Sequence, residues 1–194
     1  MSGSMLNNST KTFCSTFMVT RIIIFLVIIA TAFSCNDKKV NFQRKNEIHK
    51  IVFATGGCFG QCPIQVFSID SSLTVRYRGV KYTKKNGSYS GSIDRALFDT
   101  LNIKLENVNY KQLDSTYDGT VDDLLTELII YYGDEVKHIT SSFNDLPDNV
   151  QVLYNWLLAT QEKFVLTKTN DSLEFETQIE KGLPPINRTN TMVQ

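Results

Sequence analysis

Proline and glycine are scarce in this sequence, and these shortages narrow the possible classes of protein. The 194 residues include four prolines and ten glycines, which excludes a collagen-like chain and argues against disorder along the whole length. Apolar residues make up 42% of the chain, which is enough hydrophobic material for one ordinary globular domain.

Net charge is lacking as well. The 20 basic residues are matched by 20 acidic ones. The lysines and arginines also form no continuous stripe along the sequence. Proteins that bind nucleic acid carry a basic patch or stripe, so we expect no nucleic-acid partner.

Residues typical of common catalytic motifs are missing too. The chain has two histidines, His49 and His138, and neither stands in a recognisable pattern with a partner. There is no Gly-x-Ser-x-Gly elbow, no His-Glu-x-x-His site and no phosphate-binding loop. We therefore predict no catalytic residues and no cofactor, and we expect a protein that is not an enzyme.

An apolar run covers residues 22–33 near the N-terminus. As a helix it would span roughly 18 Å, well short of the roughly 30 Å hydrocarbon core of a membrane. Arg21 precedes the run, and Ser34 and Cys35 follow it. This order resembles a bacterial lipoprotein signal covering residues 1–34, with Cys35 as the lipid-bearing first residue of the mature protein. A start at Met18 would give a more compact signal.

The lipid on Cys35 would attach the protein to a membrane. Residues 35–47 are polar and mixed in charge, and we interpret them as a tether between lipid and domain. No run of acidic residues follows Cys35. We therefore expect a lipid-anchored protein of the bacterial cell envelope, on the outer membrane facing the periplasm. Disulfides persist in that compartment.

Residues 48–168 are predicted to form an α+β domain. Apolar and β-branched segments predict six strands, two of them joined by a tight turn at Gly133-Asp134. Apolar spacing predicts one helix over 95–108, capped by Asp94, and another over 145–161. We expect an antiparallel sheet of about six strands with two helices packed on one face. Residues 169–194 are predicted to form a polar, partly disordered tail. The predicted strands cover residues 49–55, 64–70, 73–79, 88–93, 124–132 and 135–140.

The most specific motif lies between the first two predicted strands. It consists of Gly57-Cys58-Phe59-Gly60-Gln61-Cys62-Pro63, followed by Thr74-Val75-x-Tyr77-x-Gly79, Asp122-Asp123 and Lys137. This pattern resembles an uncharacterised family of small bacterial envelope lipoproteins with a domain of unknown function, over roughly residues 48–162. At Leu73 the chain departs from that family, which tends to have a turn glycine there. The resemblance implies a fold and a location but no activity.

Three interpretations of Cys58 and Cys62 compete. A structural disulfide is favoured, and closing so short a loop would stabilise the fold by about 2 kcal/mol. A redox-active dithiol usually sits at a helix N-terminus, whereas the residues after Cys62 have strand character. A copper site would need a third ligand, for which His138 is the better placed histidine.

Four aspartates gather before the fifth predicted strand. Asp114, Asp118, Asp122 and Asp123 lack the alternating order of a calcium-binding loop. We interpret them as surface residues or turn caps.

These observations lead to one main hypothesis about function. We expect a non-enzymatic envelope lipoprotein with a binding or structural domain. Its partners would be the membrane, through Cys35, and an envelope protein or small ligand. The alternative is a periplasmic thiol-redox or copper-handling protein that uses Cys58 and Cys62.

Overall fold

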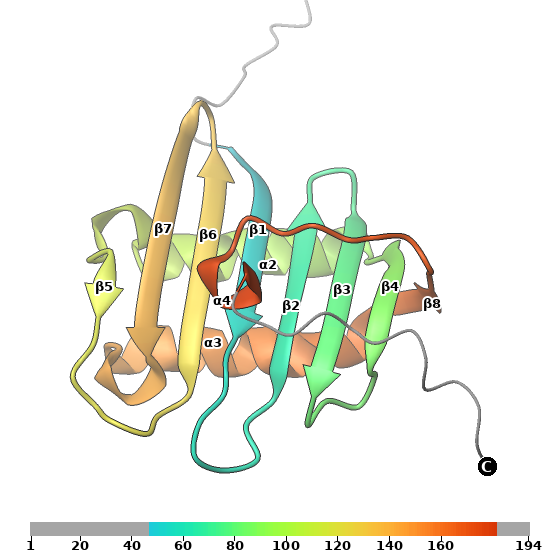
Figure 1. The fold of residues 1–194 in the computed structure, drawn as a ribbon. Coiled ribbons are helices and arrows are strands. Elements are labelled where there is room, and N and C mark those ends of the chain that lie inside the picture. The colour runs from blue at the N-terminus through green and yellow to red at the C-terminus, as the bar shows by residue number, and fades with distance from the viewer. Residues whose placement is uncertain (1–46, 182–194) are drawn as a thin grey trace, which may run out of the picture. The chain divides into compact units, whose positions relative to one another are not determined.

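The computed structural model describes residues 47–181. The predicted signal, the lipid site at Cys35, most of the predicted tether and residues 182–194 lie outside the described residues. Within the described part, eight strands form one sheet with the order β5-β7-β6-β1-β2-β3-β4-β8 (Figure 1).

The elements have the following bounds. The strands are β1 (Ile48–Thr55), β2 (Ile64–Asp70), β3 (Thr74–Lys81), β4 (Gly87–Ser92), β5 (Thr116–Tyr117), β6 (Leu125–Tyr132), β7 (Glu135–Ser142) and β8 (Val165–Lys168). The helices are α2 (Arg95–Asn107), α3 (Asp148–Thr160) and the single turn α4 (Gln178–Lys181), with short 3-10 turns η1 (Tyr110–Gln112), η2 (Phe143–Asp145) and η3 (Gln161–Lys163).

Strand β1 lies in the middle of the sheet and is buried on both faces. Ile51 and Phe53 belong to the main hydrophobic core, whereas Val52 and Ala54 belong to a second, smaller core. Successive side chains of a strand point to opposite faces, so the two cores lie on opposite sides of the sheet.

Helices α2 and α3 cover one face of the sheet (Figure 1). As predicted, the Asp94 carboxylate caps α2, accepting a hydrogen bond from the Leu97 N–H at 2.6 Å. Helix α3 begins directly after Pro147, and its Tyr154 ring meets the Phe53 ring edge-on at 5.2 Å between centroids. Both predicted helices are thus confirmed. None of the helices among residues 47–181 has the length and hydropathy to cross a membrane.

The prediction of an α+β fold with about six antiparallel strands is wrong. The fold is mostly sheet, with eight strands among the described residues, and the sheet is mixed because β5 pairs parallel to β7. Strands β5 and β8 escaped prediction because two and four residues are too short to show an alternating pattern. The parallel pairing depends on the path of the chain after η1, which local sequence does not record.

The open face of the sheet is covered by residues 169–181, here called the strap. After the edge strand β8, the strap runs back across the sheet and ends in α4, beside β1 and β6 (Figure 1). Phe175 and Thr177 of the strap are 5% and 0% exposed. The Phe175 ring packs into the second core with Val52, Val66 and Ile129.

The turn between β2 and β3 contains the residue at which the chain departs from the expected glycine. Leu73 has a φ of +69°, the left-handed conformation that glycine adopts without cost. For a leucine this conformation costs about 1–2 kcal/mol. Hydrogen bonds from the Ser72 and Thr74 N–H groups to the Asp70 carboxylate hold the turn.

Three loops lie at the same end of the strands because of the directions in which the strands run. Strands β1, β2 and β3 alternate in direction, so the β1–β2 and β3–β4 connections lie at the same end. Strand β6 is antiparallel to β1 and therefore begins at that end. Residues 56–63, 82–86 and 118–124 thus form one surface, here called the loop edge (Figure 1).

Candidate binding surface

The loop 56–63 is closed by a disulfide between Cys58 and Cys62, as the sequence predicted. Two further contacts fix its base. The Thr55 hydroxyl donates to the Pro63 carbonyl at 2.5 Å, and the Gly56 N–H donates to the Leu125 carbonyl at 2.8 Å. The loop is therefore tied to itself and to the start of β6.

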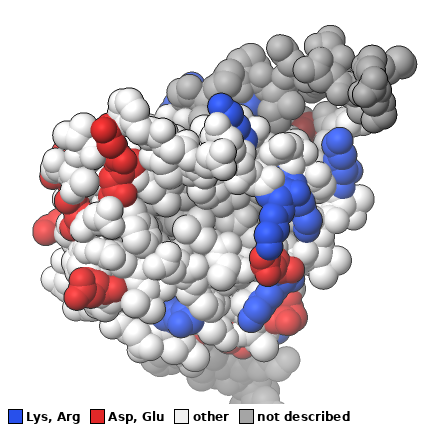
Figure 2. All heavy atoms as spheres, turned by 90° about the horizontal axis from the view of Figure 1, so that it is seen from below, with Lys and Arg blue, Asp and Glu red and all other residues white. Residues whose placement is uncertain are grey.

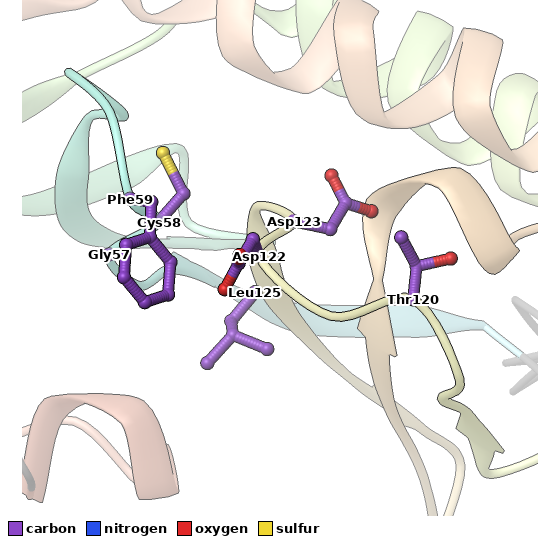
Figure 3. Close-up of a pocket in the computed structure, with 7 residues that line it drawn as sticks. All are labelled: Gly57, Cys58, Phe59, Thr120, Asp122, Asp123 and Leu125. Carbon is purple, nitrogen blue, oxygen red and sulfur yellow. The ribbon is translucent and has the colours of Figure 1, made fainter.

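Apolar side chains stand exposed on this loop and its neighbour. Phe59 is 89% exposed, Val121 is 83% exposed and Leu125 is 50% exposed. Phe59 and Leu125 line a shallow hollow of about 390 Å³ (Figure 3). In Figure 3, the disulfide loop forms one side of this hollow and the loop 118–124 forms the other.

Carboxylates hold the loop 118–124 in place. The Asp123 carboxylate accepts hydrogen bonds from the N–H groups of Leu124 and Asn144, at 2.7 and 2.6 Å. The Asp145 carboxylate accepts from the hydroxyl and the N–H of Thr120, and these bonds hold the pKa of Asp145 below its usual range. The interpretation of the aspartates as turn caps is confirmed for Asp123.

A second hollow, of about 230 Å³, lies on the other side of the disulfide loop, between Pro63 and the loop 82–86. The Tyr77 hydroxyl donates to the Gln65 side chain at 3.0 Å beside this hollow, and burial raises the pKa of Tyr77. On the rim, Lys84 forms an ion pair with Glu162 and lowers the pKa of that carboxyl group. The disulfide loop therefore stands between two depressions of the surface.

The suggested copper site of Cys58, Cys62 and His138 has no geometric support. The two cysteines are bonded to each other, and the His138 imidazole lies 2.7 Å from the Glu127 carboxylate. Across residues 47–181, no group of three histidine, cysteine, aspartate or glutamate side chains is arranged to hold a metal ion.

Glu127 is a polar residue that the sequence analysis missed. It is 0% exposed, on the strap side of β6. Its carboxylate accepts hydrogen bonds from the N–H groups of Gln178 and Ile179, at 2.9 to 3.0 Å, in addition to the contact with His138. The signal was a lone acidic residue within an apolar strand, because a buried carboxylate requires partners.

Comparison with known families gives one match. Residues 49–161 match the family model described as Domain of unknown function (DUF6438), which covers more than half of the chain. The predicted resemblance to an uncharacterised domain family is confirmed as far as membership of a family of unknown function. No curated protein matches the chain. The match includes the disulfide loop and ends before β8 and the strap.

The disulfide contributes a limited amount of stability. Because the closed loop is short, replacing both Cys58 and Cys62 with serine is expected to lower the free energy of unfolding by about 2 kcal/mol without changing the fold. Urea denaturation followed by circular dichroism measures this loss. An unfolded double variant, or one as stable as the parent chain, would contradict this assignment.

The Glu127 carboxylate is expected to hold the strap on the sheet. Hydrogen bonds to charged groups contribute about 1.5–3 kcal/mol, so Glu127→Gln should destabilise the chain by about that amount. It should also speed amide hydrogen exchange in residues 173–181. The control is Glu176→Gln, which removes only the exposed ion pair with Lys50 and should cost less than about 1 kcal/mol. Equal effects of the two variants would contradict the role of Glu127.

Proposed function

Because the chain belongs to the DUF6438 family of domains of unknown function, we propose its function from the geometry of the loop edge. The chain is a non-enzymatic binding protein of the bacterial cell envelope. It presents the disulfide loop and the adjacent hollow to a protein partner, and a lipid on Cys35 attaches it to the membrane.

The observation that carries this proposal is the exposure of Phe59. At 89% exposure, Phe59 buries little of its surface in the fold of its own chain. The loop around it is nevertheless held by a disulfide, by the Thr55–Pro63 hydrogen bond and by the link from Gly56 to Leu125. A loop fixed at its base loses less conformational entropy when it binds, which favours a role in recognition.

The surroundings of Phe59 fit the composition of a protein interface. Aromatic residues are enriched at the centres of interfaces, and polar residues form the rim. Here Phe59, Val121 and Leu125 supply the apolar part, and Thr120 and Asp122 supply polar groups at the same hollow. A protein side chain placed in the hollow would contact both kinds of group.

Photo-crosslinking tests this proposal. A photoreactive phenylalanine analogue placed at Phe59 is expected to form a covalent adduct with a specific protein in cells that carry the chain. The same analogue at Val152, which is 64% exposed on α3, serves as the control for an exposed apolar position away from the loop edge. Adducts from both positions, or from neither, would contradict a binding role for the loop edge.

The lipid anchor is tested separately by intact mass. The protein recovered from envelope membranes is expected to begin at Cys35 and to carry fatty acyl groups on it. A Cys35→Ser variant should retain the N-terminal segment and lack the acyl mass. Recovery of the parent protein with residues 1–34 still attached would refute the anchor and leave the proposal for the loop edge intact.

A further inference from the structure

The charges of this chain are segregated along its sequence in a way that the overall balance hides. Between Asp70 and Asp94 there are five basic residues and no acidic one: Arg76, Arg78, Lys81, Lys84 and Lys85. Between Lys111 and Lys137 there are seven acidic residues and no basic one. Residues 138–162 again contain no lysine or arginine.

The fold places some members of each set at opposite ends of the loop edge. Lys81, Lys84 and Lys85 lie at the β3–β4 connection. Asp118 and Asp122 lie in the loop before β6, and both are exposed. Figure 2, which views the molecule from below Figure 1, shows acidic side chains on one side and, on the other, most of the basic side chains with acidic ones among them.

The two charged ends are too far apart to neutralise each other. Strands β6 and β3 are separated by β1 and β2, which corresponds to about 14 Å at the usual strand spacing. This separation exceeds the Debye length of about 8 Å at physiological ionic strength. The two ends therefore do not pair with each other, and the ion pair of Lys84 with Glu162 lies within the basic end. Exposed Phe59 lies in the loop between the two ends.

We propose that the partner of the loop edge is a second copy of this chain, bound as a two-fold symmetric dimer. This inference rests on the proposed binding role of the loop edge. The two-fold axis lies in the plane of the interface and is perpendicular to the line that joins the acidic and basic ends of the loop edge. Rotation about this axis brings the acidic end of each copy opposite the basic end of the other. An interface of this kind is self-complementary.

Phe59 lies near the axis of this dimer. Each Phe59 faces the partner's hollow, in which Leu125 provides an apolar floor and Asp122 a polar rim. The aromatic residues then form the buried centre of the interface, and the charged pairs surround them and fix the orientation.

The bipolar edge disfavours the other classes of partner. A nucleic acid or a membrane surface rich in anionic lipids is negatively charged, so it would attract Lys81 and Lys84 while repelling Asp118 and Asp122 on the same edge. A second copy satisfies both ends at once.

A charge-exchange experiment tests the dimer. One variant carries Asp118→Lys and Asp122→Lys, so that both ends of the edge are basic. The other carries Lys81→Glu and Lys84→Glu, so that both ends are acidic. Native mass spectrometry and analytical ultracentrifugation are applied to the full-length parent chain, to each variant and to an equimolar mixture. All three chains share the same N-terminal segment, so any association through that segment is common to them.

The parent chain is expected to dimerise, with an affinity that falls as salt concentration rises. Each variant alone should be monomeric, and the mixture should form a heterodimer. Phe59→Ala in the parent chain should weaken the dimer about tenfold or more. A monomeric parent chain, variants that dimerise as the parent does, or a mixture that stays monomeric would overturn the proposal. If the parent is monomeric while Phe59 crosslinks to a different protein in cells, the binding function stands and the second copy is excluded.

Discussion

Strand β1 is buried on both faces, and this burial determines how the sheet has to be covered. A central strand with apolar side chains on both sides requires a cover for each face of the sheet. Helices α2 and α3 provide one cover, and the strap provides the other. The strap brings only a few apolar side chains to this face, so its position depends on polar contacts as well, in which the Glu127 carboxylate binds the start of α4.

The same arrangement determines where a partner can approach. One face of the sheet is occupied by helices and the middle of the other by the strap, whereas Phe59 and Val121 on the loop edge remain exposed. The disulfide loop lies at the centre of this edge because it connects β1 and β2, and these two strands lie between β6 at the acidic end and β3 at the basic end. A rigid loop with an exposed aromatic residue is thereby placed between an acidic and a basic group of side chains.

Local sequence patterns predicted most elements but not their assembly. Apolar and β-branched segments identified β1 to β4 and the β6–β7 hairpin, and spacing and capping identified α2 and α3, because these signals arise from neighbouring residues. The short strands β5 and β8 carry no such signal, and their pairing depends on contacts distant in sequence. For the site, the motif predicted the Cys58–Cys62 bond. Glu127 and Gln178 are 51 residues apart in the chain, so their hydrogen bond is evident only from the fold.

The position of the strap also bears on where this domain ends. The family match stops at residue 161, yet β8 and the strap beyond it complete the sheet edge and the second core. A chain ending at residue 161 would leave β4 as an uncovered edge strand and would expose Val52, Val66 and Ile129 to water. Unpaired strand edges and exposed apolar surface are the two features that lead β-proteins to aggregate. Residues 165–181 therefore protect this domain against aggregation, and the folding unit is longer than the family match suggests.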